Sequence, residues 1–247
     1  MKVCAIIPAR YSSSRFPGKV IHLLCGKPVV VWVWENIKKI DGISCCYVAT
    51  EDQRVVDVCK KYGITAIITS PNHQSGTDRI WEVSSKVQAD IYINVQGDEP
   101  FITKQAILLP LKLIKEDNEF DITTAVAPIK NPELINNINT VKVVVENKRA
   151  VYFSRLPVPY HHSLSEMKNI IPYYRHIGIY VYKRQALEKF VNAPKSIIEN
   201  LERLEQLRAL SIGLSIGVEI IEYQAPAIDL PSDIQLAEKY IKENNLL

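Results

Sequence analysis

The sequence lacks the long apolar run that a membrane-spanning helix requires. No stretch of about 18 uncharged apolar residues occurs anywhere in the 247-residue chain. The chain also reaches Pro8 and Arg10 almost at once, which leaves no room for the apolar core of a secretory signal. We therefore expect a soluble cytoplasmic protein without membrane insertion.

A strong net charge is also missing. The chain carries 30 Lys and Arg residues against 27 Asp and Glu residues, and the resulting charge of +3 is too small to predict binding to nucleic acid. Because cations gather near the N-terminus, a small anionic ligand such as a nucleotide fits better. A hydrophobic content of 47% over this length supports a substantial core.

Several signatures of covalent and metal chemistry are absent. The five cysteines show no C-x-x-C spacing and no nearby histidine pair that would complete a zinc site, so we expect reduced, structural thiols. No G-x-S-x-G motif and no spacing typical of a Cys/His or Ser/His/Asp arrangement occurs, which leaves a covalent hydrolase without support.

Short apolar runs alternate with segments of helical period, which predicts βαβ units on a mostly parallel sheet. The predicted strands are Val3–Ile7, Cys45–Ala49, Ala66–Ile68, Ile91–Val95 and, later, Ile177–Tyr182. A polar stretch follows the aromatic, proline-rich segment 151–160, so residues 151–185 are expected to form an excursion that packs on a second subunit.

Four segments are expected to be helices. Gln53–Tyr62 has apolar residues at helical spacing and is followed by a glycine. Pro28–Ile40 has strand propensity, but Pro28 suits a first helical position, and its context favours a buried helix. Ile197–Leu210 is expected to form one continuous helix. The last helix is expected to begin near Ser232, which has capping-box spacing to Gln235.

The most informative motif follows the first predicted strand. Residues 6–19 read IPARYSSSRFPGK, in which Arg10, Arg15 and Lys19 place three cations within ten residues. The serines and Gly18 can turn the backbone so that amides and cations converge on an anion, although the spacing matches neither a Walker A loop nor a dinucleotide motif. The alternative is an exposed basic loop.

Two further segments lie next to predicted strands or helices. Asp98 sits in NVQGDEP (94–100) at the carboxyl end of a strand, where it can hold Mg²⁺ or, alternatively, cap backbone amides of a turn. In SGTDR (75–79), Thr77 or Asp78 is expected to cap a helix. Arg79 would place a positive charge in the first turn, where the helix dipole favours negative charge. This mildly indicates that Arg79 is there to bind a ligand.

A third group of polar residues lies later in the chain. Arginine can bind a carboxylate through two hydrogen bonds, so this group suits an acidic, hydroxyl-rich substrate, although a His-Arg pair is more often structural. The group consists of Arg155, Arg175, His176, Tyr180, Glu205 and Gln206.

Together these motifs closely resemble the 3-deoxy-manno-octulosonate cytidylyltransferase family, the CMP-Kdo synthetases, along essentially the whole chain. The resemblance rests on IPARYSSSRFPGK (6–19), VATEDQRV (48–55), SGTDR (75–79), NVQGDEP (94–100), VKVV (141–144), VYFSRLPVPY (151–160), RHIGIYVY (175–182), LEQLRAL (204–210) and IDLPSDI (228–234). Several unrelated motifs in the same order make coincidence a poor explanation.

The resemblance implies a Rossmann-like, three-layer α/β nucleotidyltransferase fold with a mostly parallel sheet. It implies one domain over residues 1–247, with the β-rich excursion at 151–185 serving dimerisation and sugar binding in a homodimer. It also implies coupling of CTP to 3-deoxy-D-manno-octulosonate (Kdo), which gives CMP-Kdo and pyrophosphate for lipopolysaccharide biosynthesis.

The resemblance also assigns residues to roles. Nucleotide binding falls to Pro8, Ala9, Arg10, Arg15, Lys19, Ser75 and Arg79; sugar binding to Gln96, Arg155, His176, Tyr180, Glu205 and Gln206; and Mg²⁺ binding to Asp98 and Asp229. The anomeric hydroxyl would attack the α-phosphorus in line, with Lys19 and Arg15 offsetting charge on the departing pyrophosphate. No side chain is an obvious general base, so we hypothesise that metal coordination through Asp98 and Asp229 replaces one.

The chain departs from the family pattern at several positions. Val20 follows Lys19 where proline is usual, NINTVKVV replaces NPNVVKVV, and IDLPSD (228–233) replaces V-D-T-P-E-D. The last change retains Asp229 but alters the residues that would support it.

Three alternatives stay open. A CMP-transferase for 8-amino-3,8-dideoxy-manno-octulosonate shares the class, as does one for a nonulosonate, although sialate-type enzymes usually open with a G-G-S-K-G loop that is missing here. A non-catalytic nucleotide-binding homologue is disfavoured because both aspartates and all three loop cations are present.

Overall fold

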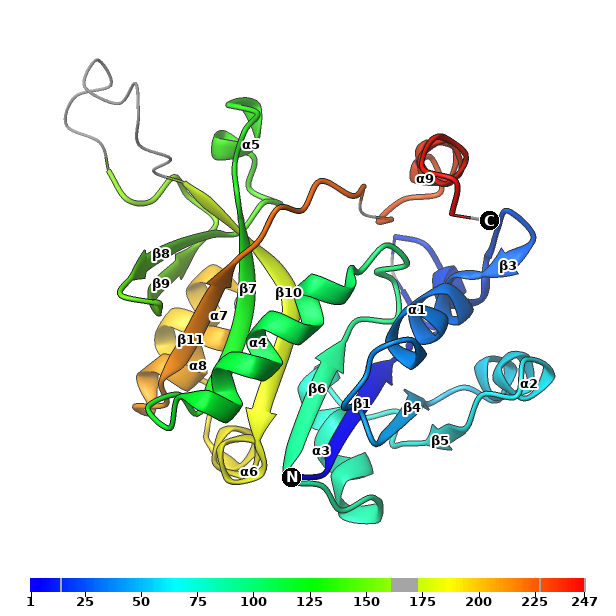
Figure 1. Ribbon diagram of the computed structural model, residues 1–247, viewed down its shortest axis with the longest axis horizontal. Helices are drawn as coiled ribbons and strands as arrows, with labels where there is room; N and C mark the ends of the chain where they lie inside the picture. Colours follow the sequence, from blue (N-terminus) through cyan, green and yellow to red (C-terminus); the bar gives the residue numbers. More distant parts are fainter. Residues whose placement is uncertain (14, 161–172, 227, 247) are drawn as a thin grey trace. The chain divides into compact units, whose positions relative to one another are not determined.

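The computed structural model describes residues 1–13, 15–160, 173–226 and 228–246. The chain divides into two compact units (Figure 1). The first consists of Met1–Lys104 and Gln224–Leu247, and the second of Gln105–Tyr223. The tail of the chain therefore returns to the unit in which the chain begins.

The first unit is built on a parallel sheet of apolar strands. Its strands are β1 (Val3–Pro8), β4 (Cys45–Thr50), β5 (Ala66–Ile68) and β6 (Ile91–Val95), in the order β5-β4-β1-β6. All residues of β1 and β6 are buried, as expected for central strands covered on both faces. The four strands predicted for this part of the chain are confirmed.

The connections of this sheet create a crevice. Its crossover helices are α1 (Val29–Lys38), α2 (Gln53–Lys61) and α3 (Gly76–Lys86). The chain steps outward from β1 to β4 and β5, then returns to the other side of β1 as β6. Right-handed crossovers therefore place α3 on the face opposite α1 and α2. The order reverses between β1 and β6, where open α/β sheets bind ligands.

Short elements complete the first unit. They are the 3₁₀ helix η1 (Lys19–Ile21), the hairpin strands β2 (Leu23–Leu24) and β3 (Lys27–Pro28), and the last helix α9 (Asp233–Glu243). The buried helix expected from Pro28 onward is confirmed, but Pro28 precedes it as the cap residue rather than opening its first turn. Helix α2 stops before Gly63, whose φ of 69° the absent side chain permits.

The second unit has a mixed sheet. Its elements are α4 (Lys104–Glu116), β7 (Ile122–Pro128), α5 (Glu133–Asn136), β8 (Lys142–Glu146), β9 (Arg149–Ser154), β10 (Tyr174–Lys183), α6 (Arg184–Asn192), α7 (Ile197–Glu202), α8 (Gln206–Ser211) and β11 (Ile216–Ile220). The strand order is β10-β7-β11-β9-β8, and β10 also pairs with β8. Strand β11 runs parallel to β7, whereas β10 runs antiparallel to it.

One helix prediction is wrong. The segment expected to form one helix over Ile197–Leu210 is two short helices, α7 and α8, because Arg203 adopts a left-handed conformation (φ 54°) that ends α7. Leu204 and Leu207 are buried as expected, but Leu201 is 78% exposed.

The excursion expected at 151–185 includes most of β9 and all of β10. Its residues 161–172 lie outside the described part of the chain. Across the described ranges, no helix combines the length and the apolar character needed to cross a membrane.

Candidate active site

The site begins where β1 and β6 end side by side. The Gly97 amide donates to the Pro8 carbonyl at 3.1 Å, which joins the loops that leave the two strands. A Cβ atom on Gly97 would lie 2.7 Å from that carbonyl oxygen and 3.1 Å from the Cβ of Ala9. Only glycine fits without displacing backbone, so this close approach explains the glycine in NVQGDEP.

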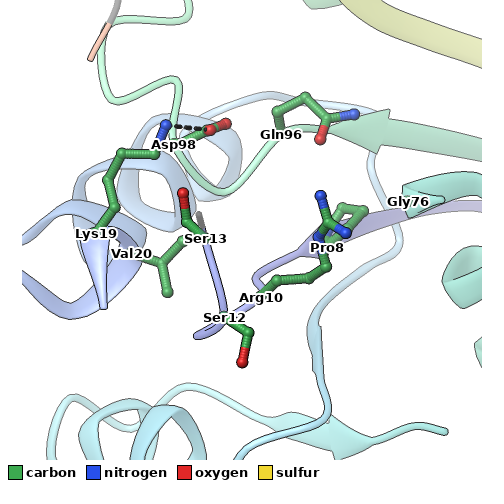
Figure 2. Close-up of a pocket in the computed structure, with 9 residues that line it drawn as sticks. All are labelled: Pro8, Arg10, Ser12, Ser13, Lys19, Val20, Gly76, Gln96 and Asp98. Atoms are coloured by element: carbon green, nitrogen blue, oxygen red, sulfur yellow. Dashed lines mark ion pairs between the residues drawn. The ribbon is translucent and has the colours of Figure 1, made fainter. Parts of the chain in front are cut away.

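A hollow of about 110 Å³ opens at this junction (Figure 2). Ligand pockets usually measure about 300–1,000 Å³, so this one accommodates part of a nucleotide-sized ligand. Figure 2 shows Arg10, Gln96, Lys19 and Asp98 arranged around the space. The lining residues are Pro8, Arg10, Ser12, Ser13, Lys19, Val20, Gly76, Gln96 and Asp98.

Lys19 connects the hollow to the tail of the chain. Its side chain is 7% exposed, and its Nζ atom lies 2.6 Å from Asp98 Oδ2 and 3.7 Å from Asp229 Oδ1. The ammonium also donates to the Ile228 carbonyl at 2.6 Å, and Arg15 pairs with Asp229 at 3.0 Å. Two cations and two carboxylates that are far apart in the sequence therefore form one cluster.

The arrangement of Asp98 and Asp229 fits a divalent cation. Both carboxylates lie within 4 Å of Lys19 Nζ. One cation placed between them can therefore contact an oxygen of each. Among the described residues, no group of three or more His, Cys, Asp or Glu side chains could hold a metal. Two carboxylates suit Mg²⁺, which commonly takes one or two from the protein and completes its shell with phosphates and water.

Asp233 supports this cluster and was missed in the sequence. Its Oδ2 atom accepts from the backbone amides of Asp229 and Leu230, each at 2.8 Å. Ser232 does precede α9, but it makes no side-chain capping bond, so the predicted capping box is wrong. The changed residues of IDLPSD therefore leave intact the carboxylate that holds the Asp229 backbone.

The SGTDR segment contributes mainly local structure. The cap of α3 is Ser75 rather than Thr77 or Asp78, since Ser75 Oγ accepts from the Asp78 amide and Asp78 accepts from the Ser75 amide in a capping box. Gly76 lines the hollow. Arg79 is not among the lining residues and is 1% exposed.

The remaining expected contacts belong to the second unit, apart from Gln96, whose amide donates to Asn94 Oδ1 at 3.1 Å. His176 lies between the rings of Phe153 and Tyr180 and bonds Thr124 Oγ1 at 3.0 Å through Nε2. Desolvation lowers the pKa of His176 to about 3, so the imidazole is neutral at pH 7.

Tyr180 and Glu205 share this environment. Burial raises the pKa of Tyr180 well above its usual value, with further contributions from Tyr182 and the Glu205 carboxylate. Tyr180 is therefore a neutral hydrogen-bond donor. Gln206 is buried at the start of α8, directly after Glu205.

Arg155 and Arg175 bind backbone instead of pointing freely outward. Arg155 donates to the carbonyls of Glu202 and Ile138, each at 2.9 Å, which ties the end of β9 to two other segments. Arg175 donates to the Tyr223 carbonyl and lies over the Tyr223 ring.

Sequence similarity to known proteins extends over nearly the whole chain. The profile of the Cytidylyltransferase family matches residues 4–218. A 3-deoxy-manno-octulosonate cytidylyltransferase of Elusimicrobium minutum is 46% identical over 240 residues, which cover 97% of this chain and 98% of the relative. An 8-amino-3,8-dideoxy-manno-octulosonate cytidylyltransferase of Shewanella pealeana is 40% identical over 243 residues, with coverage of 96% and 98%.

The fold agrees with these sequence similarities. A solved structure of CMP:2-keto-3-deoxy-manno-octonic acid synthetase complexed with CTP matches with a TM-score of 0.93 at 37% identity. The match covers 99% of this chain and 100% of the other. The expected α/β nucleotidyltransferase fold is thereby confirmed.

Proposed function

The chain belongs to the cytidylyltransferase family, and we propose that it couples CTP to Kdo and releases CMP-Kdo and pyrophosphate. The observation that carries this proposal is the cluster at the β1–β6 crevice. There Lys19 lies against Asp98 and Asp229, beside a hollow that Arg10 also lines. A relative named for this activity matches 97% of this chain.

The loop cations bind the triphosphate in this proposal. Arg10 faces the hollow, and Lys19 and Arg15 lie close to the carboxylates that would hold the metal. Pro8, Ala9 and Ser75 are proposed to line the remaining nucleotide pocket. Cations fixed before the reaction stabilise developing negative charge on the pyrophosphate without reorganising during the step.

The chemical step is an in-line displacement. The anomeric hydroxyl of the sugar attacks the α-phosphorus, the bond between the α-phosphorus and the bridging oxygen breaks, and pyrophosphate leaves while the hydroxyl proton passes to solvent. Asp98 and Asp229 would hold Mg²⁺, which would supply charge neutralisation and would make the attacking hydroxyl more acidic. The protein contributes orientation, with Lys19 and Arg15 placed to meet the leaving group.

Sugar-binding roles are proposed for Gln96 in the first unit and, considered by themselves, for residues of the second unit. His176 and Tyr180 are neutral groups that can bond hydroxyls, and Glu205 and Gln206 add an acceptor and an amide. Arg155 already donates to backbone carbonyls, so its contribution to the pocket is to hold the end of β9 in place.

We propose a homodimer formed through the second unit. Three apolar side chains next to the Arg155 contacts are more than 60% exposed, namely Ile138, Leu156 and Leu201. Arg155 precedes Leu156 and binds the carbonyls of Ile138 and of Glu202, which follows Leu201, so the three residues lie on neighbouring segments. We propose that their side chains form one surface. Exposed apolar patches of this kind mark protein interfaces.

The cytoplasm is the proposed location. All five cysteines are free thiols in the structure, as is usual for proteins of a reducing compartment. The product would supply a sugar acid for lipopolysaccharide biosynthesis, as the sequence resemblance implies.

The experiment that tests the function is pyrophosphate release from CTP and Mg²⁺ with separate sugar acids. Kdo is expected to support turnover, and 8-amino-3,8-dideoxy-manno-octulosonate is the second candidate because a relative of that name is 40% identical. If pyrophosphate is released only with the amino sugar, the substrate is that sugar and not Kdo. No release with either sugar or with sialic acid would point to a non-catalytic nucleotide-binding protein.

A further inference from the structure

A buried ion pair adjoins the loop that lines the hollow. Arg79 Nη2 lies 3.1 Å from Glu51 Oε2, and the two side chains are only 1% and 12% exposed. Arg79 Nη1 donates to Thr69 Oγ1 at 2.5 Å and reaches the Ser70 carbonyl at 3.4 Å. Thr69 in turn donates to the Thr50 carbonyl, so Arg79 is fixed to the ends of β4 and β5.

The other oxygen of Glu51 holds the loop. Glu51 Oε1 accepts from the Tyr11 amide at 3.0 Å and from the Ser12 amide at 3.5 Å. Ser12 lines the hollow directly, and Arg10 precedes the two amides. One carboxylate therefore links a buried cation on one side to the phosphate-binding loop on the other.

Tyr11 is the point at which this loop is anchored. Its carbonyl accepts from the Gly18 amide at 2.8 Å, which closes the loop immediately before Lys19. Its ring lies 3.4 Å from the Arg54 guanidinium, and Asp52 holds that guanidinium at 2.6 Å. The hydrogen bond from the Tyr11 amide to Glu51 therefore fixes the start of the loop at Tyr11 and, through the Tyr11 carbonyl, its end at Gly18.

The burial of Arg79 excludes a direct role at the ligand. With 1% of its surface accessible, its guanidinium has no face open to a nucleotide. Burial lowers the pKa of Arg79, Glu51 opposes this effect, and the nearby Arg10 cation lowers the pKa further. Glu51 thus lies where it offsets repulsion between a structural cation and a loop cation.

We propose that Arg79 and Glu51 are positioning residues that fix the loop at Tyr11 and Ser12 before the triphosphate binds. This inference rests on the proposed function, because CTP is the ligand whose phosphates the loop would meet. A loop that is ordered in advance binds more tightly, since apparent affinity scales with the fraction of molecules already in the competent conformation.

Glutamine cannot replace Glu51 in this arrangement. A carboxylate accepts hydrogen bonds at both oxygens, whereas an amide accepts at one side and donates at the other. In Glu51→Gln the NH₂ group must therefore face either the Arg79 guanidinium or the loop amides, and either choice sets one donor against another. Removing the cation as well, in Glu51→Gln with Arg79→Met, frees the amide oxygen to accept from Tyr11.

The test compares CTP affinity in the presence of Mg²⁺ with hydrogen exchange of the loop. Arg79→Lys and Glu51→Gln are expected to raise the Kd for CTP about tenfold and to speed amide exchange at Tyr11 and Ser12, while kcat at saturating CTP changes by less than about twofold. The double variant is expected to regain part of the affinity that Glu51→Gln loses.

The matched control is Arg208→Lys in the second unit. Arg208 pairs with Glu199 at 2.6 Å, and both side chains are as buried as the Arg79 pair, so this variant reports the cost of weakening any buried ion pair. Equal effects of Arg208→Lys and Arg79→Lys on CTP affinity would overturn the inference, as would unchanged loop exchange in Glu51→Gln. Failure of the wild-type protein to bind CTP would instead overturn the proposed function, with the exchange measurement still testing the positioning role.

Discussion

Single residues of the cluster carry the proposed metal chemistry. Asp98→Asn keeps the shape of the side chain but removes the charge that Lys19 meets at 2.6 Å. Because the lysine contacts this carboxylate and the proposed metal would bind it, we expect kcat to fall by about 10²–10³-fold, the size of effect seen when one stabilising group is lost.

Pyrophosphate release at saturating CTP measures this loss, and circular dichroism verifies the fold. Asp57→Asn, an exposed carboxylate on α2, is the control and is expected to keep full activity. Near-normal turnover of a folded Asp98→Asn protein would refute the metal role.

His176 gives the second unit a pH-dependent stability. Its pKa falls from 6.5 to about 3 in the folded protein, so the unfolded chain binds more protons between these values. Stability from the neutral imidazole is therefore complete above pH 6.5 and is lost as pH falls toward 3. Between pH 6.5 and 5 the loss is about 2 kcal/mol at about 1.4 kcal/mol per unit.

Urea unfolding at several pH values checks this expectation. His176→Gln removes the titrating group, so its unfolding free energy should depend less steeply on pH over the same range. Equal slopes for the two proteins would show that another group is responsible.

At the scale of elements, the contact between the β1 and β6 ends depends on Gly97. In Gly97→Ala the new Cβ would lie 2.7 Å from the Pro8 carbonyl oxygen, which separates the loops that line the hollow. We expect a loss of about 1–3 kcal/mol in unfolding free energy, typical of overpacking, and a marked loss of CTP binding.

Gly76→Ala provides a graded comparison by thermal unfolding and CTP titration. Its Cβ would lie 3.3 Å from the Pro8 side chain and 3.6 Å from Gln96 Nε2, both side-chain atoms, so a smaller effect is expected. If both variants behave like wild type, the close approach does not shape the site.

Some of the helices and strands could be predicted from sequence patterns and others could not. The strands of the first unit follow from apolar runs, because a central parallel strand needs apolar residues on both faces. The break between α7 and α8 could not be predicted from the sequence. It occurs at Arg203, which adopts a left-handed conformation although this position has no glycine to indicate it. Asp233 was missed because its acceptor role depends on a turn rather than on helical period.

For the whole molecule, the proposed dimer predicts that charge at the exposed apolar surface separates the subunits. Leu156→Asp is expected to convert a dimer to a monomer in sedimentation experiments, because a carboxylate would be buried without a partner. Leu23→Asp, at an exposed leucine of the first unit, is the matched control and should remain dimeric. A wild-type monomer at micromolar concentration would contradict the proposal.

The sequence by itself determined the strands of the first unit, the cationic loop and the family, because hydrophobic period and motif spacing are local properties of the chain. The tertiary structure alone decided which charges meet. Arg15 and Asp229 are 214 positions apart and form an ion pair, while Arg79 does not line the hollow and pairs with Glu51. Charge pairing falls off with distance in space, which sequence separation does not measure, so only the folded chain could assign these partners.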